Sequence, residues 1–266
     1  MKDKTNSSYA VITGASKGLG KAFAFELARL GRNIVLVSLP DQRLQNVVAA
    51  IKGTYDVEVA YFETDFVCSD NIMVLCEWLN SNFNIDILIN NAGVGGTTRF
   101  TDVNVNYIET MIQVNVTATV ILTHQLLSNL KRQACSYILN VSSIAAFSPV
   151  GYKTVYPASK VFVHYFTRGL RAELKDSSVS VSVVHPGPMA TNPEIEARIE
   201  KQGFIAKLTL LKPEKVARFA ICRLLKKDSV IVLSHFTWVV SKLLPEWLTL
   251  YLMTRIVKRE MKTQLA

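Results

Sequence analysis

The sequence predicts an α/β fold in which helices cover both faces of one doubly wound, parallel sheet of about seven strands. Short apolar runs alternate with segments whose apolar residues recur at helical spacing. Hydrophobic residues make up 49% of the 266 residues, which suits a parallel sheet that is buried on both faces. Because no internal repeat, low-complexity tract or Gly/Ser-rich linker divides the chain, we expect one domain over residues 1–266.

The apolar runs predict the strands, and the helical spacing predicts the helices between most of them. The expected strands are Tyr9–Thr13, Asn33–Ser38, Val57–Glu63, Ile87–Asn90, Tyr137–Val141, Val179–His185 and Val230–Leu233. The expected helices are Gly18–Arg29, Gln42–Lys52, Asn71–Phe83, Val105–Leu130, Val155–Leu174 and Pro213–Leu225. Strands that alternate with helices pair in parallel through right-handed crossovers. Such sheets bind ligands at the carboxyl ends of their strands, so functional residues are expected there.

A glycine-rich turn follows the first predicted strand. Residues 13–20 read TGASKGLG and lead into the first predicted helix. Glycines permit a tight turn and the close approach of a ligand to the backbone, and a helix N-terminus offers N–H groups to a diphosphate. An ordinary strand–helix turn is the alternative, but three glycines at this spacing favour a nucleotide site.

Polar residues also follow two later strands. Asn90–Gly93 (NNAG) ends the fourth strand, and Ser142 and Ser143 end the fifth. Asn115 stands inside the predicted helix 105–130. Taken singly, such residues are typical of turns, solvent-facing helix positions and local backbone hydrogen bonds.

Tyr156 and Lys160 lie one helical turn apart, so their side chains point the same way. The unperturbed pKa of a phenol is near ~10, too high for easy loss of the proton at neutral pH. A neighbouring ammonium favours the phenolate, which makes the pair a candidate acid/base. The alternative is a solvated helix face, on which a Tyr and a Lys at this spacing are common.

Together, in order and spacing, these motifs resemble the short-chain dehydrogenase/reductase family. The matching features are TGxxxGxG at 13–20, NNAG at 90–93, Asn115, Ser143, YxxxK at 156–160, and Pro186-Gly187 followed by Thr191. Ser143 fits better than Ser142 because it lies thirteen residues before Tyr156, as in the family pattern. The resemblance covers Tyr9 to about Leu233 and implies a Rossmann-like fold and an NAD(P)-dependent oxidoreductase.

The resemblance also implies roles for individual residues. Tyr156 is the implied general acid in carbonyl reduction, Ser143 bonds the substrate oxygen, and Lys160 holds the nicotinamide ribose. Asn115 supports a water that links Lys160 to solvent. Asp65 is expected at the adenine amino group, with a turn or helix-cap role as the alternative. The full set of implied cofactor-binding residues is Gly14, Ser16, Lys17, Gly18, Leu19, Gly20, Ser38, Asp65, Asn91, Ala92, Gly93, Tyr156, Lys160, Pro186, Gly187 and Thr191.

The end of the second strand bears on the cofactor. Family members that prefer NAD usually carry an acidic residue there, where this chain has Ser38, so a 2′-phosphate is not repelled. Lys17 occupies a position often used for that phosphate, whereas Leu39 stands where an Arg is common. Two charged residues close by favour different cofactors: the Asp41 carboxylate favours NAD(H), and the Arg43 guanidinium favours NADP(H). We expect NADP(H), with NAD(H) as the alternative.

The C-terminal part of the sequence bears on the substrate. A mobile lid helix is expected over Pro193–Lys207, and Thr97–Phe100 is expected beside the pocket. Residues 237–266 predict an amphipathic tail of two helices, packed near the substrate cleft or a dimer partner. A weak membrane-surface contact through its aromatic and basic residues is the alternative. The tail resembles the ketoacyl reductase and hydroxysteroid dehydrogenase branch, which implies an apolar carbonyl or alcohol substrate, ketoacyl or steroid-like.

The composition limits which partners and which cellular compartment fit the chain. The net charge of +9 comes without zinc-finger spacing or interleaved aromatic and basic residues, so we expect no nucleic-acid partner and no metal. The four cysteines form no CxxC pair and predict buried or partly buried free thiols in a reducing compartment. With a polar N-terminus, this predicts a cytoplasmic protein, with a peripheral membrane location as the alternative. The family resemblance implies a homodimer or homotetramer. The competing function is a nucleotide-binding sensor or peripheral membrane protein with little catalysis.

Overall fold

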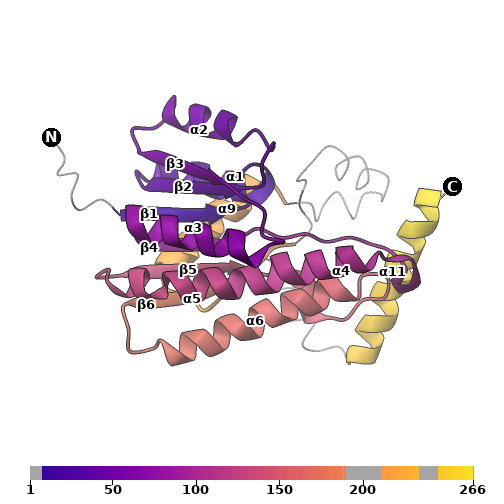
Figure 1. The fold of residues 1–266 in the computed structure, drawn as a ribbon. Coiled ribbons are helices and arrows are strands. Elements are labelled where there is room, and N and C mark those ends of the chain that lie inside the picture. The colour runs from indigo at the N-terminus through magenta and orange to yellow at the C-terminus, as the bar shows by residue number, and fades with distance from the viewer. Residues whose placement is uncertain (1–7, 188, 190–210, 234–244, 266) are drawn as a thin grey trace.

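The computed structural model describes residues 8–187, 189, 211–233 and 245–265, and its sheet has seven parallel strands in the order β3-β2-β1-β4-β5-β6-β7 (Figure 1). All six strand pairs are parallel. The strands are β1 Ser8–Thr13, β2 Asn33–Ser38, β3 Val59–Glu63, β4 Asn84–Asn90, β5 Ser136–Val141, β6 Val179–His185 and β7 Val230–Val232. The predicted fold class is confirmed.

Helices cover both faces of the sheet (Figure 1). Their bounds are α1 Gly18–Arg29, α2 Leu44–Lys52, α3 Ser69–Asn82, α4 Val105–Ile112, α5 Ala118–Lys131, α6 Val155–Glu173, α9 Pro213–Leu225 and α11 Glu246–Leu265. Buried residues of α1, α2 and α9 share one hydrophobic core with the sheet. Those of α3 and α5 form a second core on the other face, where Leu170 of α6 packs against it.

The strands supply both cores because their side chains alternate between the two faces. In β1, Ala10 and Ile12 belong to the core under α1, whereas Val11 belongs to the core under α3 and α5. β2 repeats this alternation. These strands read as continuous apolar runs because both of their faces are buried.

The strand order reverses beside β1, whose two neighbours are β2 and β4. Open parallel sheets bind ligands at this kind of reversal, outside the carboxyl ends of the strands. The turn after β1 and the loop after β4 therefore meet at one edge of the sheet, where the candidate site is built.

Two predicted helices begin or run differently in the structure. α2 starts at Leu44 rather than Gln42, because Asp41 and Arg43 have φ values of 60° and 53° and are not helical. The helix expected over 105–130 is divided into α4 and α5 by a π-helical segment, Gln113–Thr117.

The tail and the cysteines also refine the predictions. α11 provides one helix of the expected tail, whereas residues 237–244 and the lid expected at Pro193–Lys207 lie outside the described residues. Within the described ranges, no helix combines the length and apolarity that a membrane span needs. The cysteines are free as expected, but Cys68 and Cys222 are exposed and not buried, because they lie on outward faces beside α3 and in α9.

Candidate active site

The glycine-rich turn between β1 and α1 has a backbone that favours glycine. Gly14 and Gly18 have φ values of 67° and 55°. A Cβ on Gly20 would lie 2.1 Å from the carbonyl oxygen of Gly14, so α1 packs directly on the preceding loop. No side chain caps α1, whose N-cap residue is the exposed Lys17. The first N–H groups of α1 therefore suit an anion such as a diphosphate, and these residues fit a dinucleotide.

A hydrogen-bond network holds this turn against the end of β4. Thr13 Oγ1 accepts the backbone N–H groups of Asn91 at 2.9 Å and Ala92 at 3.0 Å. The side-chain amide of Asn91 donates to the carbonyl oxygen of Thr13 at 2.8 Å. Asn91 and Ala92, both expected at the cofactor, therefore join the two strands that border the site.

The residues expected at the adenosine end follow β2 and β3. Ser38 ends β2, is 5% exposed, and donates its hydroxyl to the carbonyl oxygen of Leu39 at 3.0 Å. Asp65 follows β3, and its carboxylate accepts the N–H of Val67 at 3.0 Å. This contact is the turn role that the sequence offered as the alternative for Asp65.

Tyr156 lies in the first turn of α6, with its ring against the loop after β4. A Cβ on Gly95 would lie 2.6 Å from Cδ2 of Tyr156, so the ring contacts the Gly95 backbone directly. Burial raises the pKa of Tyr156 above its usual value, and a hydrogen bond with Ser143 partly opposes this increase. The phenol therefore keeps its proton at neutral pH.

Ser143 and Ser142 follow β5 but serve different elements. Ser143 contacts Tyr156, and its Oγ accepts the N–H of Ala145 at 3.1 Å, which caps the 3-10 turn Ile144–Phe147. Ser142 instead donates its hydroxyl to the carbonyl oxygen of Lys160 at 2.8 Å and is 3% exposed. The structure therefore places Ser143, and not Ser142, beside the candidate acid.

Lys160 is a buried ammonium, 5% exposed, whose Nζ donates to the carbonyl oxygen of Val141 at 3.0 Å. Burial lowers the pKa of Lys160 from 10.5 to about 8. Nζ lies 5.8 Å from the centroid of the Tyr156 ring. Burial sets the direction of the Tyr156 pKa shift here, and the expected effect of Lys160 on the phenolate stays a prediction.

Asn115 lies in the π-helical segment and is 1% exposed. Its amide donates to the carbonyl oxygen of Val94 at 2.9 Å and to Ser159 Oγ at 3.0 Å, and its Oδ1 accepts the N–H of Val94 at 2.8 Å. These bonds fix the loop after β4 against α6. A Cβ on Gly93 would lie 3.1 Å from Asn115 Oδ1 and 3.3 Å from Lys160 Nζ, so Asn115 and Lys160 both border the same glycine.

Three segments beside the site contact one another. Thr98 N–H donates to the carbonyl oxygen of Tyr152 at 2.8 Å, and Gly151 N–H donates to Thr254 Oγ1 of α11 at 2.9 Å. The loop after β4, the loop before α6 and α11 therefore lie together. Pro186 accepts the N–H of Ile144 at 3.1 Å, and Gly187 follows it. Thr191 lies outside the described residues.

This arrangement suits proton transfer to a carbonyl oxygen. The structure brings the four predicted catalytic residues, Asn115, Ser143, Tyr156 and Lys160, to the carboxyl edge of the sheet. A serine hydroxyl and a protonated phenol together are two donors for one developing oxyanion. The Lys160 charge stands within one helical turn of that position.

Comparison with known proteins agrees with this geometry. The family model described as short chain dehydrogenase matches residues 8–202, which is most of the chain. The chain belongs to the short-chain dehydrogenase family.

Relatives of this short-chain dehydrogenase include very-long-chain 3-oxoacyl-CoA reductase-A of Danio rerio, which is 35% identical over 77% of the chain and 62% of the relative. The chain thus spans less than two thirds of that relative's length. Hydroxysteroid dehydrogenase-like protein 1 of Gallus gallus is 31% identical over 99% of the chain and 81% of the relative.

Solved structures similar to this short-chain dehydrogenase include the bulky-bulky ketone specific alcohol dehydrogenase of Comamonas testosteroni. It is 26% identical, has a TM-score of 0.77, and covers 90% of this chain and 91% of its own. A short-chain dehydrogenase of Sphingobium yanoikuyae in complex with NADPH is 26% identical, has a TM-score of 0.78, and covers 89% and 92%. As a member of this family, the chain is a nicotinamide-dependent oxidoreductase, and these comparisons give no support to the alternative of a nucleotide-binding sensor.

Several residues that shape the short-chain dehydrogenase site received no role of their own in the sequence analysis. Thr13 joins the strands, Ser159 accepts from Asn115, and Gly95 supports the Tyr156 ring. The glycine pair Gly95-Gly96, shortly after NNAG, was the one signal that pointed to a close backbone approach.

The Gly95 contact gives a prediction. We expect Gly95→Ala to lower turnover about 10- to 100-fold without changing cofactor affinity, because the added methyl displaces the Tyr156 ring. Steady-state kinetics and cofactor titration measure the two effects. Gly96→Ala is the matched control, since its Cβ would lie 3.5 Å from the nearest atom, in Tyr107. Equal turnover in both variants would contradict the prediction.

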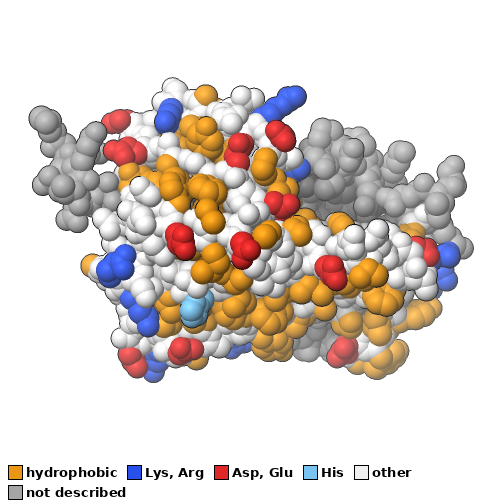
Figure 2. Space-filling view, viewed as in Figure 1, with side chains coloured by type: hydrophobic (Ala, Val, Ile, Leu, Met, Phe, Trp, Pro, Cys, Tyr) orange, Lys and Arg blue, Asp and Glu red, His pale blue; other side chains and the backbone are white. Residues whose placement is uncertain are grey.

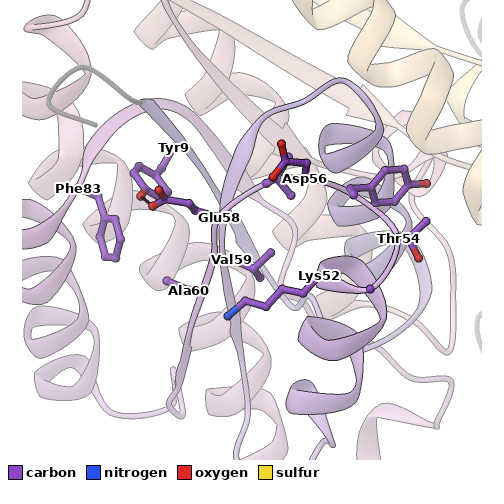
Figure 3. Close-up of a pocket in the computed structure, with 11 residues that line it drawn as sticks. Tyr9, Lys52, Thr54, Asp56, Glu58, Val59, Ala60 and Phe83 are labelled. Carbon is purple, nitrogen blue, oxygen red and sulfur yellow. Dashed lines mark hydrogen bonds between the residues drawn. The ribbon is translucent and has the colours of Figure 1, made fainter. Parts of the chain in front are cut away.

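A separate cavity of about 730 Å³ lies at the opposite end of the sheet (Figure 3). Tyr9 and Val59 line it from the amino ends of β1 and β3, with Lys52 and Phe83 nearby. Glu58 also lines this cavity, and its carboxylate accepts a hydrogen bond from the Tyr9 hydroxyl. Because Tyr156 and its neighbours lie at the carboxyl ends of the strands, this cavity is distinct from the candidate active site.

Proposed function

We propose that this chain reduces the keto group of a bulky apolar substrate, ketoacyl or steroid-like, and oxidises the corresponding alcohol in the reverse direction. The contact between Ser143 and a protonated Tyr156 carries the proposal. In reduction, Ser143 holds the carbonyl oxygen while Tyr156 gives up its proton to it. When bound, the nicotinamide cofactor supplies or accepts the hydride. Lys160 contributes N–H donors and positive charge near the expected nicotinamide ribose.

The substrate class is supported by the relatives and by the surroundings of the site. One relative is named a very-long-chain 3-oxoacyl-CoA reductase, and a similar structure is specific for bulky-bulky ketones. In this chain, α11 meets the loop before α6 through Thr254 and Gly151. This contact places part of α11 beside the loop that precedes Tyr156.

The test is an assay of NADPH and NADH oxidation over three panels: 3-oxoacyl thioesters of increasing chain length, ketosteroids, and small polar ketones. We expect turnover with one of the first two panels and little with the third. Turnover confined to small polar ketones would overturn the substrate class. Cofactor binding without turnover on any panel would overturn the proposed activity.

We infer further that the cofactor is NADP(H). Ser38 puts a neutral, 5% exposed side chain at the end of β2, and the exposed Lys17 stands at the N-cap of α1. This combination leaves a 2′-phosphate unopposed at the end of β2 and places a cation in the glycine-rich turn after β1. The similar structure from Sphingobium yanoikuyae holds NADPH.

Ser38→Asp tests the cofactor proposal. A carboxylate at the end of β2 repels a 2′-phosphate and accepts a hydrogen bond from a 2′-hydroxyl. We expect kcat/KM for NADPH to fall at least about tenfold while that for NADH holds or rises. Ser38→Asn has the same shape without the charge and serves as the control. An equal loss with both cofactors would mean that Ser38 does not face this part of the ligand.

A second candidate function is contact with a membrane surface through α11. Its exposed apolar side chains include Trp247 at 70%, Tyr251 at 58% and Ile256 at 50%. The basic residues Arg255 and Lys258 lie on the same exposed helix. A helix that exposes both apolar side chains and cations can contact an anionic lipid surface, and the net charge of +9 has the matching sign.

Vesicle flotation tests this contact. We expect the full chain to float with phosphatidylserine vesicles and much less with neutral phosphatidylcholine vesicles. Replacing Arg255, Lys258 and Arg259 by Gln is expected to abolish the difference, and Trp247→Ser to weaken binding to both. Replacing the surface residue Lys175 by Gln is the control. Identical flotation of all variants would remove the membrane proposal.

We also infer that the chain forms a homodimer or homotetramer in the cytoplasm. Hydrophobic side chains gather over α5 and α6 on the face shown in Figure 2. On α6, Phe162 is 43% and Tyr165 68% exposed. Burial of these rings against a second copy would explain their exposure in one chain.

A further inference from the structure

His185 is a buried, polar side chain at the end of β6 with no part in the proposed chemistry. It is 0% exposed. Its Nδ1 lies 2.9 Å from the carbonyl oxygen of Ser143, and its Nε2 lies 3.0 Å from Nδ1 of His164 on α6. The Phe147 ring packs on it with centroids 4.4 Å apart. His185 therefore bridges α6 and the backbone of the candidate catalytic serine.

The direction of this bridge follows from its chemistry. A carbonyl oxygen only accepts, so His185 Nδ1 carries the proton and donates to Ser143. Burial lowers the pKa of His185 to about 4, which keeps the ring neutral at pH 7. A neutral imidazole has one N–H, so Nε2 accepts and His164 Nδ1 donates to it. The chain of donors runs from His164 through His185 to Ser143.

The His185 bridge is one of several hydrogen-bonded contacts between α6 and the end of β5. Tyr156, Lys160 and His164 lie four residues apart on one stripe of α6. Lys160 Nζ donates to the carbonyl oxygen of Val141, and Ser142 Oγ donates to that of Lys160. Three consecutive residues, 141–143, are thus tied to α6, the last of them through His185.

Of these hydrogen bonds, the one from His185 to the Ser143 carbonyl oxygen matters most for the proposed reaction. Beyond Ser143 the chain enters the 3-10 turn Ile144–Phe147, which contains no buried residue. Side-chain packing therefore restrains this segment less than it restrains β5. The peptide after Ser143 also has two backbone hydrogen bonds: its carbonyl oxygen accepts the N–H of Ala146 at 3.0 Å, and the N–H of Ile144 donates to Pro186. The hydrogen bond from His185 is the side-chain contact that links this peptide to β6 and α6, and it helps to set the direction of the Ser143 hydroxyl toward Tyr156.

We propose that His185, supported by His164, is a positioning residue that holds Ser143 in place beside Tyr156. The inference rests on the proposed function, since it assigns a role to residues behind the same site. It requires no contact of either imidazole with substrate or cofactor.

The first test does not depend on activity. Nitrogen-15 correlation spectra of the histidine rings, assigned with His185→Asn, report the tautomer of His185 at pH 7. We expect a neutral ring protonated on Nδ1. A ring protonated on Nε2, or a cation, would overturn the proposal whatever the enzyme turns over.

The second test compares His185→Leu with His185→Asn. Leu removes the donor, whereas the Asn amide places an N–H near the position of Nδ1. We expect His185→Leu to lower kcat about 10- to 100-fold and His185→Asn to restore it to within about threefold, with NADPH affinity unchanged in both. Equal losses in the two variants, or none in His185→Leu, would contradict the inference. Absence of turnover in the unaltered protein would instead count against the proposed function.

A double-mutant cycle separates positioning from general support of the fold. If His185 acts through Ser143, His185→Leu adds little further loss of kcat in a Ser143→Ala background. Additive losses would mean that the two residues act independently and would overturn the role. Should His185→Leu fail to fold in a thermal melt, His164→Leu gives the same comparison. We expect it to lose about threefold in kcat and His164→Asn to restore it; equal losses would again contradict the proposal.

Discussion

Replacement of Tyr156 by Phe is expected to lower carbonyl reduction by about a thousandfold, because it removes only the hydroxyl that gives up the proton. The ring itself is retained, so its contact with the Gly95 backbone persists. NADPH affinity is therefore expected to change less than about threefold. Single-turnover kinetics and fluorescence titration with NADPH measure the two quantities.

Tyr165→Phe is the matched control for this substitution. It removes a phenol from the same helix, at a position that is 68% exposed. Its turnover is expected to equal that of the unaltered protein. Full activity of Tyr156→Phe with the substrate that the unaltered protein reduces would refute the proposed mechanism.

Replacement of Lys160 by Met is expected to lower turnover at least about a hundredfold and to stabilise the fold at pH 7. Burial lowers the pKa of Lys160 from 10.5 to about 8, so the unfolded chain binds this proton more tightly than the folded chain. The charged group thus destabilises the fold by up to about 3 kcal/mol below pH 8. Loss of the hydrogen bond to Val141 offsets part of the gain, so we expect a net increase of about 1–2 kcal/mol.

The stability difference between the unaltered protein and Lys160→Met is expected to depend on pH. As pH rises from about 8 toward 10.5, the folded chain releases the Lys160 proton while the unfolded chain still holds it. Stability of the unaltered protein therefore rises in this window relative to Lys160→Met, and the difference between the two shrinks. Urea denaturation at pH 7 and near pH 10 measures it. Lys175→Met, at an exposed position, is the control. A variant that is less stable than the unaltered protein at pH 7 would contradict this account of the buried ammonium.

Much of the scaffold follows from the sequence because its signals are local. Strands buried on both faces read as continuous apolar runs, and β2 and β6 have the predicted bounds. The glycine-rich turn, NNAG and the Tyr–Lys spacing are short motifs whose meaning depends on the adjoining strand or helix. The parallel sheet then places all of them at one edge.

Other properties of the site depend on contacts that no local pattern encodes. Asn115 falls within a regular helical pattern, yet the π-helical segment turns it inward to bond Val94. The pKa of Tyr156 depends on burial by loops distant in sequence, which the spacing of Tyr156 and Lys160 alone does not encode. His185 reads simply as the last residue of an apolar strand, and its two partners come from the segment after β5 and from α6.

The hydrogen bonds between the ends of β1 and β4 have a consequence for how the chain folds. Thr13 meets Asn91 and Ala92 across 78 and 79 residues, and Gly151 meets Thr254 across 103. Each such closure costs chain entropy before its contacts return any energy, so folding dominated by pairings of this kind is slow. A nascent chain that has not yet been synthesised as far as β4 already contains the glycine-rich turn. It still lacks Asn91 and Ala92, which bond Thr13 at the start of that turn. The binding edge therefore assembles late, and the half-made sheet exposes the edge of β1 until β4 docks.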